Sequence, residues 1–348
     1  MADTMKAAVL HGVEDLRIED VPTPQLQSPA DVLVHVSRVG VCGSDIHYYR
    51  HGRIGRFVVE KPMILGHECA GEVVEVGAQV TDLKPGDRVA LEPGIPCRQC
   101  EFCRTGHYNL CPDVVFLATP PVDGAFCEYV TSPADFAFKL PENVSLEEGA
   151  MCEPLAVGMY ATKRGRVGLG DTVVVLGAGP IGLVTLQAAK ARGATTLIVT
   201  DVEDMRLALA RKLGATHTLN ARQQDAAAAI KELTGGRGAD VVLEAAGTTA
   251  TTQQALQVVK SGGRVILIGL PPEDNVPLSL PDLISRELDV GGIFRYANVY
   301  PQAIAAIASG LIDVKSMITH RYPLAQAQEA LVFADTHKGE CLKVSVEV

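Results

Sequence analysis

The sequence predicts an α/β protein of two domains, in which a β-rich part precedes a part built on a parallel sheet. Three observations predict this fold class. The chain has 348 residues, more than one ordinary compact core accommodates. Short apolar runs separated by Gly and Pro turns fill residues 1–150. From about residue 153 onward, apolar runs alternate with Ala-rich segments that are typical of helices.

The first part of the chain has the pattern of short antiparallel strands. Apolar stretches such as "KAAVLHG", "LRIEDVPTP" and "DVLVHVSRVGVCG" end in turn residues, and "GEVVEVG" and "GDRVALEP" continue the pattern. The C-terminal segment "CLKVSVEV" is also strand-like but is too short to have a core of its own. We therefore expect it to return to the first domain.

The second part of the chain indicates a parallel sheet. Continuous Val/Ile/Leu runs occur in "DTVVVLGAG", "TTLIVTD", "ADVVLEAAG" and "GRVILIGLP", with helical patterns between them. Strands of this kind are buried on both faces, as in doubly wound sheets. We expect the intervening helices to end at Gly214 and Gly262.

Composition excludes several classes of protein. Hydrophobic residues make up 47% and charged residues 21%, and the formal net charge is -10. This acidic balance disfavours nucleic acid and anionic membranes as partners. The N-terminal residues lack a secretory pattern and no apolar stretch is long enough to cross a bilayer, so we expect a cytoplasmic protein. Four of the nine cysteines fall between residues 97 and 111, and in that compartment such a cluster favours metal ligation over disulfides.

A glycine-rich motif predicts a dinucleotide site. Gly177, Gly179 and Gly182 form G-x-G-x-x-G directly after a strand, and Pro180 and Ile181 open the next helix. The glycines allow a tight turn, the approach of a pyrophosphate and close helix–strand packing. The helix N-terminus is suited to phosphate. The alternative is a glycine-rich turn that binds nothing.

The next strand predicts the type of dinucleotide. It ends at Asp201, where a carboxylate accepts the ribose hydroxyls and repels a 2′-phosphate, which favours NAD over NADP. Arg206 follows and either stacks on the adenine or partly restores NADP binding.

Four clustered cysteines predict a metal lobe. Cys97, Cys100, Cys103 and Cys111 have the spacing C-x2-C-x2-C-x7-C, and four thiolates complete a tetrahedral zinc shell. Because no position stays open for substrate, this zinc is expected to be structural. The alternatives are an iron–sulfur cluster, free core cysteines or a nucleic-acid zinc ribbon, and the acidic composition disfavours the last.

A second set of zinc-ligand residues is spread along the chain. Cys42 ends an apolar strand, His67 and Glu68 stand together in "GHE", and Glu153 lies where the β-rich part gives way to the α/β part. Three protein ligands and a water make a catalytic zinc site. Taken singly, each residue also has an ordinary interpretation as a core thiol, a turn residue or a surface acid.

These motifs together resemble a known family. "VCGSDIH", "GHECAGEVVEVG", the cysteine lobe, "CEPLAVG" and "GAGPIG" follow the order found in the zinc-containing medium-chain dehydrogenases, over essentially the whole chain. "SDIHYYRHGRIGRFVVEKPM" and "FRYANVYP" are similar to segments of sorbitol and xylitol dehydrogenases. The resemblance implies a GroES-like catalytic domain over 1–156 and 290–348, with the metal lobe at about 93–113, and a Rossmann NAD-binding domain over 157–289.

The resemblance also implies roles for the zinc-site residues. Cys42 and His67 would bind the catalytic zinc with Glu68 as third ligand, and Glu153 would either hold the water at zinc or become a ligand itself. Ser44 would hydrogen-bond the reacting hydroxyl and start a proton path that ends at His47.

Substrate and cofactor contacts are implied in the same way. The residues expected to meet polyol hydroxyls are Tyr48, Glu153, Arg295 and Tyr296. Those expected beside the nicotinamide are Ile268, Gly269, Leu270, Ile293, Phe294 and Arg295.

The implied activity is zinc-dependent oxidation of a secondary hydroxyl of a sugar alcohol to a ketose, with hydride transfer to NAD. Related dehydrogenases for arabinitol, galactitol, threonine or simple alcohols are alternatives, as is an NAD-binding protein without catalysis. The family also implies a homo-oligomer, with a tetramer favoured over a dimer.

Overall fold

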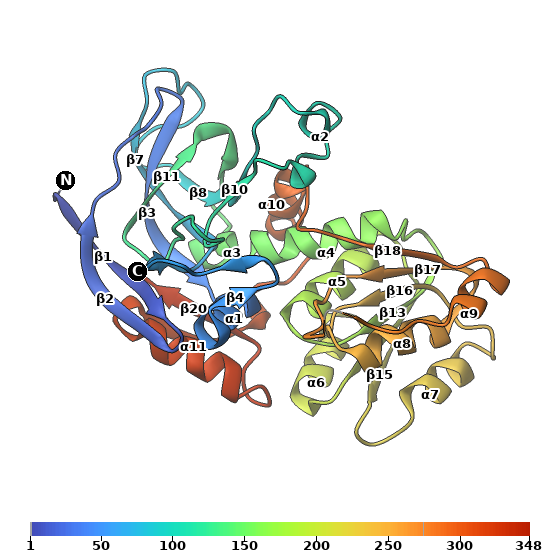
Figure 1. The fold of residues 1–348 in the computed structure, drawn as a ribbon. Coiled ribbons are helices and arrows are strands. Elements are labelled where there is room, and N and C mark those ends of the chain that lie inside the picture. The colour runs from blue at the N-terminus through green and yellow to red at the C-terminus, as the bar shows by residue number, and fades with distance from the viewer. Residues whose placement is uncertain (1, 274) are drawn as a thin grey trace. The chain divides into compact units, whose positions relative to one another are not determined.

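The structure is a computed structural model that describes residues 2–273 and 275–348. The described chain divides into two compact units (Figure 1). Unit 1 comprises Met1–Glu153, Tyr300–Ser309 and Val314–Val348, and unit 2 comprises Pro154–Val299 and Gly310–Asp313. The N-terminal half of the chain and its C-terminal end therefore share one unit.

Unit 1 is mostly β. Its strands are β1 (Thr4–Gly12), β2 (Asp15–Pro22), β3 (Asp31–Gly40), β4 (Arg53–Ile54), β5 (Phe57–Val58), β6 (Met63–Ile64), β7 (Glu68–Val76), β8 (Arg88–Leu91), β9 (Gly94–Ile95), β10 (Val115–Phe116), β11 (Tyr129–Pro133), β12 (Ala137–Lys139), β19 (Ile318–Pro323) and β20 (Lys343–Glu347). Its helices are α1 (Gly43–His51), α2 (Glu101–Arg104), α3 (Leu146–Ala150), α10 (Tyr300–Ala308) and α11 (Ala327–Thr336). Single turns of 3₁₀-helix lie at Tyr108–Leu110, Ala134–Phe136, Lys315–Met317 and Leu324–Gln326.

The main sheet of unit 1 has β3 at its centre. The strand order is β12-β8-β7-β3-β20-β19, and β11 also pairs with β3. Val32, Val34 and Val36 of β3 are fully buried, so the middle of this strand belongs to the core. The C-terminal strand β20 pairs with β3 through Ser345 and Gly40. The end of the chain thus lies beside the strand that leads to Cys42.

Unit 2 is a parallel sheet with helices. Its strands are β13 (Thr172–Leu176), β14 (Thr196–Asp201), β15 (His217–Asn220), β16 (Ala239–Glu244), β17 (Val259–Leu267) and β18 (Asp289–Gly292). Its helices are α5 (Pro180–Ala191), α6 (Asp204–Leu213), α7 (Ala226–Leu233), α8 (Thr249–Val258) and α9 (Leu280–Ser285). Helix α4 (Cys152–Arg164) begins in unit 1 and continues into unit 2.

The strand order of unit 2 is β15-β14-β13-β16-β17-β18, with every neighbouring pair parallel. This is the doubly wound order, whose switch point lies between β13 and β16. Helix α5 packs against β13, β14 and β16, and α8 packs against β16 and β17. The predicted α/β fold class is confirmed.

One predicted helix end is right and one is wrong. Helix α6 ends at Gly214, which has a left-handed φ of 114°. Helix α8, however, ends at Val258, and Gly262 lies within β17. The buried Val259 already pairs with Ala239, and the ladder then resumes at Val241–Arg264, so the extra residues around Gly262 form an irregularity in the strand.

Candidate functional site

Strand β3 delivers Cys42 to the start of a helix. The chain leaves β3 at Gly40, and Cys42, which is partly exposed, is the N-cap of α1. The buried carboxylate of Asp45 accepts hydrogen bonds from the backbone N–H of Cys42 at 2.9 Å and of Gly66 at 3.0 Å. Asp45 therefore fastens the Cys42 turn to the turn that carries the next two candidate ligands.

His67 and Glu68 occupy the entry to β7. Gly66 has a left-handed φ of 87°, and this bend lets the chain turn just before the strand. His67 is 6% exposed and Glu68 is 1% exposed. One ligand atom each from Cys42, His67 and Glu68 lies within 4.8 Å of the others. Sulfur, imidazole nitrogen and carboxylate oxygen are all zinc donors, so the residues present fit this metal.

The predicted fourth member lies near this group but outside it. Glu153, at the start of α4, is 5% exposed. Its charge contributes to the raised pKa of His67. Within the described residues, the group whose ligand atoms meet is Cys42, His67 and Glu68, without Glu153.

Several charged side chains around His67 determine its pKa. Burial by itself lowers the pKa of this imidazole. The charge of Cys42, its hydrogen bond to His67, and the charges of Asp45 and Glu153 together outweigh burial and raise the pKa to about 10. The Nδ1 atom lies 3.9 Å from Asp45 Oδ1. The pocket is thus arranged for a cation between its acidic side chains.

Lys343 and Asp45 are site residues that the sequence did not reveal. Lys343 begins β20, is 2% exposed, and forms an ion pair through Nζ with Glu68 Oε2. Burial lowers the pKa of Lys343, but Glu68 and Cys42 outweigh it, and the pKa is raised overall. Nothing in the local sequence of Lys343 indicates this contact. Asp45 could have been found as an acid three residues after an N-cap.

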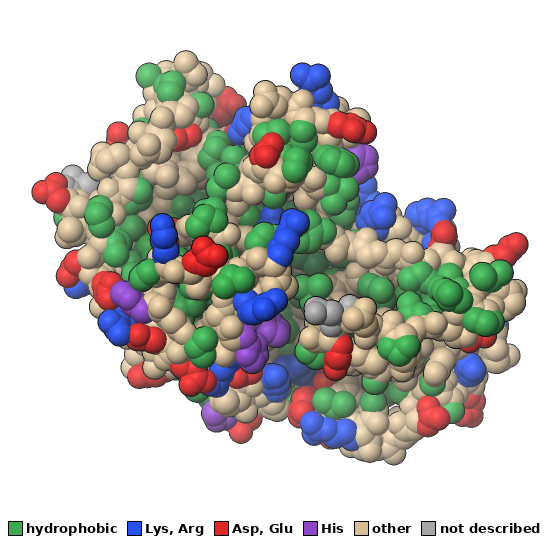
Figure 2. Space-filling view, in the orientation of Figure 1, with side chains coloured by type: hydrophobic (Ala, Val, Ile, Leu, Met, Phe, Trp, Pro, Cys, Tyr) green, Lys and Arg blue, Asp and Glu red, His purple; other side chains and the backbone are tan. Residues whose placement is uncertain are grey.

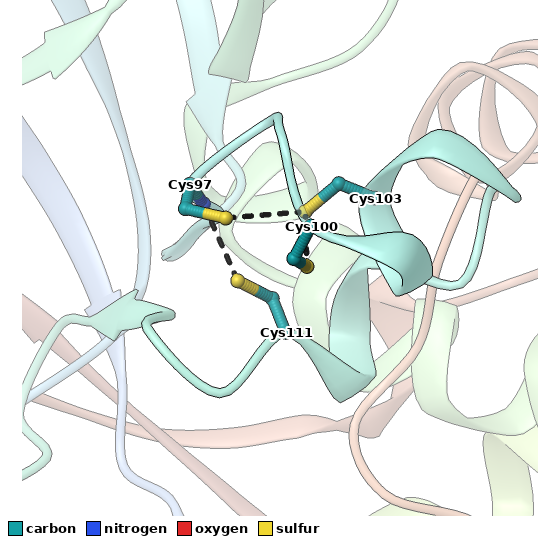
Figure 3. A group of neighbouring side chains, drawn as sticks. All are labelled: Cys97, Cys100, Cys103 and Cys111. Atoms are coloured by element: carbon teal, nitrogen blue, oxygen red, sulfur yellow. Dashed lines mark hydrogen bonds between the residues drawn. The ribbon is translucent and has the colours of Figure 1, made fainter.

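The four-cysteine cluster lies in the lobe formed by α2 and the 3₁₀ turn before Cys111 (Figure 3). The Sγ atoms of Cys97 and Cys103 are 3.9 Å apart, and those of Cys100 and Cys103 are 3.4 Å apart. Tetrahedral zinc with bonds of about 2.3 Å places its sulfur ligands roughly 3.8 Å from one another. All four ligand atoms lie within 4.8 Å of one another, so the lobe fits a closed zinc shell.

Backbone N–H groups also favour the thiolate form of Cys97, which is the form that binds a metal. Those of Gln99 and Cys100 lower the pKa of Cys97 to about 7, which favours the thiolate. The N–H of Cys97 points at Cys111 Sγ, at 3.3 Å.

Helix α1 carries three further candidates. Ser44 is partly exposed and follows Cys42 by two residues, whereas His47 lies on the exposed side of the helix. Burial and the neighbouring His51 lower the pKa of His47. Tyr48 is 4% exposed.

The glycine motif of unit 2 adopts the expected turn. Gly177 has a left-handed φ of 98°, and a Cβ at Gly182 would lie 1.9 Å from the Gly177 oxygen, so both positions require glycine. Pro180 is the first residue of α5, with Gly179 as N-cap and Ile181 next in the helix.

Asp201 closes this turn through the backbone. Its carboxylate accepts hydrogen bonds from the N–H of Ala178 at 2.6 Å, Val202 at 2.8 Å and Glu203 at 2.9 Å. It therefore stands at the glycine turn, as the position at the end of β14 predicts. The side chain of Arg206 reaches the same turn, with Nη1 3.8 Å from where a Cβ on Gly179 would be.

The remaining cofactor and substrate candidates lie after β17 and β18. Ile268, Gly269 and Leu270 follow β17, and Leu270 is 75% exposed. Ile293, Phe294, Arg295 and Tyr296 follow β18. The Arg295 guanidinium lies 4.7 Å from the centre of the Phe294 ring, and Tyr296 is buried.

Glu244 was missed by the sequence reasoning. This buried residue ends β16, and its Oε1 accepts hydrogen bonds from the N–H of Ala246 and of Gly247, each at 2.9 Å. Its backbone oxygen accepts from Ile268 and Gly269. Glu244 thus ties together two loops at the carboxyl edge of the sheet.

Charged side chains of both signs are mixed on the surface that Figure 2 draws. On the face drawn in Figure 2, the described Lys and Arg side chains are interspersed with Asp and Glu and form no continuous basic band. Throughout the described chain, every helix is too short or too polar to cross a membrane.

Comparison with known proteins matches both parts of the chain. Residues 28–142 match the family model of the alcohol dehydrogenase GroES-like domain, and residues 180–309 match that of zinc-binding dehydrogenases. The predicted GroES-like domain and the resemblance to zinc-containing medium-chain dehydrogenases are confirmed.

Full-length relatives agree. The chain is 52% identical to sorbitol dehydrogenase of Bacillus subtilis (strain 168), covering 98% of this chain and 97% of that one. It is 47% identical to sorbitol dehydrogenase of Rattus norvegicus, covering 97% and 94%. A solved structure from Sinorhizobium meliloti 1021, named for a zinc-binding dehydrogenase and bound to NADP, has a TM-score of 0.90 at 33% identity and covers both chains completely (100% and 100%). This protein is therefore an oxidoreductase that belongs to the zinc-binding dehydrogenases with a GroES-like alcohol dehydrogenase domain.

Proposed function

We propose that this protein is a zinc-dependent polyol dehydrogenase that oxidises a secondary hydroxyl of a sugar alcohol to a ketone and passes the hydride to NAD. The observation that carries the proposal is the meeting of Cys42, His67 and Glu68 in a buried, charge-compensated pocket. The sorbitol dehydrogenases, at about half identity over nearly the whole chain, support polyols as the substrate class.

The residues assigned to the two metals differ in purpose. Cys42, His67 and Glu68 would hold the catalytic zinc, with Glu153 beside them, and Cys97, Cys100, Cys103 and Cys111 would hold the structural zinc. When bound, the catalytic zinc supplies Lewis acidity that lowers the pKa of the alcohol and stabilises the developing carbonyl. The thiolate and carboxylate ligands offset its charge, which moderates that acidity.

Protons and substrate hydroxyls are assigned to this chain's own side chains. We assign Ser44 Oγ to accept the proton of the reacting hydroxyl and the His47 ring to release it to solvent. Burial and the neighbouring His51 lower the pKa of His47, which favours release of a proton from the ring. The side chains of Tyr48, Arg295 and Tyr296 can each donate hydrogen bonds to polyol hydroxyls.

The cofactor assignment rests on unit 2. NAD accepts the hydride when bound, and the glycine turn from Gly177 to Gly182 together with Asp201 is suited to its pyrophosphate and ribose. Asp201 favours NAD, although the Sinorhizobium neighbour holds NADP. We assign residues 268–270 and 293–295 to the nicotinamide side. In these terms unit 1 acts as the catalytic domain and unit 2 as the cofactor domain.

The cysteines support a cellular compartment for the enzyme, and an edge strand supports its assembly into oligomers. All nine cysteines are free, which suits the reducing cytoplasm that we propose. Strand β18 is an edge strand of the unit 2 sheet, where a second copy could extend the ladder. We propose a homo-oligomer, with a tetramer as the assembled form, and xylitol as a substrate beside sorbitol.

The test is a substrate panel measured beside metal content. Rates on sorbitol, xylitol, arabinitol, galactitol, threonine and ethanol are determined with NAD and with NADP, and zinc per chain is counted in the same samples. We expect kcat/KM to be highest for polyols with NAD and to vanish when zinc is stripped. Faster turnover of ethanol or threonine, or full activity without zinc, would refute the proposal.

A further inference from the structure

A buried lysine occupies the strand next to the metal-ligand group. Lys343 is 2% exposed, and its Nζ donates a hydrogen bond to the Val41 oxygen at 2.9 Å and forms the ion pair with Glu68 Oε2. An ammonium is costly to bury unless it is paired and hydrogen-bonded. Lys343 satisfies both conditions. It donates a hydrogen bond to Val41, the residue before Cys42, and it pairs with Glu68, a candidate ligand.

The backbone leaves room for this pair. Gly40 lies opposite Glu68 in the β3–β7 ladder and opposite Ser345 in the β20–β3 ladder. A Cβ at position 40 would lie 2.1 Å from Glu68 Oε2 and 3.0 Å from Lys343 Cε. Three strands therefore meet around one ion pair, and a side chain at Gly40 would displace it.

If a metal binds the metal-ligand group, the Glu68 carboxylate has two cationic partners, that metal and the Lys343 ammonium. Glu68 offers an oxygen to the group that it forms with Cys42 and His67, while its Oε2 is held by Lys343. By contrast, the ligand atoms of the four lobe cysteines lie within 4.8 Å of one another, and the neighbouring Arg98 pairs with Asp135 and with none of these cysteines. In the buried group, therefore, one candidate ligand, Glu68, is already paired with the cationic side chain of Lys343.

We propose that Lys343 is a positioning residue that weakens Glu68 as a metal ligand and so keeps that coordination position exchangeable. This inference rests on the proposed zinc site. Without the ammonium, Glu68 would be a buried carboxylate that depends more strongly on a bound metal for compensation of its charge. It would then bind the metal persistently, and the shell could no longer exchange this carboxylate for water.

The experiment compares Lys343→Met, Lys343→Arg, Glu68→Gln and the double variant Lys343→Met/Glu68→Gln as full-length, metal-loaded enzymes. The catalytic metal is replaced by Co²⁺, whose visible spectrum reports its ligands. Release of metal to a chelator gives a rate for each site, and the lobe metal serves as the internal control.

We expect Lys343→Met to slow release of the catalytic metal about tenfold, to change the Co²⁺ spectrum and to lower kcat more than it raises KM. Lys343→Arg, which keeps the charge, should recover most of the normal release rate. In the Glu68→Gln background, Lys343→Met should have no further effect on release.

The inference is overturned if Lys343→Met shows normal release and an unchanged spectrum, or if its effect persists when Glu68 is glutamine. If Lys343→Met does not fold, Lys343→Arg and the double variant test the proposal instead. If Lys343 had a structural role alone, these variants would lose the catalytic metal and the lobe metal equally. A failure of the polyol proposal would appear in the substrate panel and would leave these spectra and release rates unaffected.

Discussion

The two metal-ligand clusters of unit 1 differ in how deeply their ligands are buried and in the charges around them. His67 and Glu68 are almost completely buried, and Asp45, Glu153 and Lys343 surround them with charge. In the lobe, by contrast, Cys97, Cys100 and Cys103 are only half-buried, and the ligands are sulfur alone. The first cluster joins three donor types in a charged pocket, and the second joins one donor type near solvent.

This difference explains which cluster is suited to chemistry. A closed set of four thiolates leaves no position for a substrate, so the lobe can only hold its chain segment together. A three-residue group with a carboxylate already shared with Lys343 leaves a position that can change partners. Burial also strengthens the electrostatic effect of each neighbouring charge.

The largest expected effect comes from removing one thiol from each cluster. Cys42→Ser should lower kcat/KM on the order of a thousandfold, because it removes a ligand of the metal that polarises the alcohol. Cys100→Ser should remove the lobe metal and lower the melting temperature, with the catalytic metal retained. Metal analysis, thermal unfolding and polyol kinetics measure the three effects.

NADH binding is the control for this pair, since the glycine turn lies in unit 2 and should be intact in both variants. If Cys42→Ser kept normal turnover, or if Cys100→Ser emptied both sites together, the two clusters would not differ in the way described.

Glu92 is a buried acid that contacts the lobe turn and is influenced by Glu153. It follows β8, is 3% exposed, and accepts a hydrogen bond from Tyr108 Oη of the lobe turn at 2.7 Å. Burial raises the pKa of Glu92 from 4.5 to about 7; the Tyr108 hydrogen bond opposes this rise, and the charge of Glu153 adds to it. The pKa of the Glu92 carboxyl group therefore depends both on Tyr108 of the lobe turn and on Glu153 beside the buried pocket.

The sign of its pH dependence follows from the raised pKa. Between pH 4.5 and about 7, folded Glu92 holds a proton that the unfolded chain has released, so its contribution to stability is present below this window and is lost as pH rises through it. The loss amounts to at most roughly 3 kcal/mol. Urea unfolding of Glu92→Gln should therefore show a weaker decline in stability between about pH 5.5 and 8 than the natural protein does.

The exposed Glu142→Gln is the matched control and should follow the natural protein. Identical slopes for Glu92→Gln and the natural protein would mean that Glu92 is ionised throughout and that the buried pocket does not influence it.

Features encoded by short spacings could be predicted from the sequence. The glycine turn, the cysteine quartet and the alternation of strands and helices depend on local patterns that few other structures satisfy. Cys42, His67 and Glu68 are recognisable as zinc-ligand types, but the family resemblance was needed to join their two separate segments into one site. Their meeting depends on the pairing of β3 with β7, which no local pattern specifies.

The missed features depend on long-range pairing. Lys343 reaches Glu68 because β20 returns to β3, across most of the chain. Gly262 was wrongly expected to end a helix, because the pairing of Val259 with Ala239 starts the strand earlier than the glycine indicates. In both cases a sheet partner that is remote in sequence decided the outcome.

The smallest expected effect concerns the lobe surface. Arg98 lies between the first two lobe cysteines, and its Nη1 and Nη2 donate to the Asp135 carboxylate at 2.6 and 2.7 Å. Both side chains are about half exposed, at 51% and 56%, so solvent and salt screen the pair. Arg98→Gln should lower the free energy of unfolding by less than about 1 kcal/mol and leave the lobe metal in place.

Urea unfolding with metal analysis, at low and at high salt, checks this prediction, and the difference between variant and natural protein should shrink as salt rises. Lys343 provides the contrast, since its ion pair is buried and salt should hardly affect it. A loss of several kcal/mol in Arg98→Gln, or release of the lobe metal, would show that the lobe depends on its surface pair rather than on its four sulfur ligands. The distinction between a charge-supported pocket and a self-sufficient thiol cluster would then not hold.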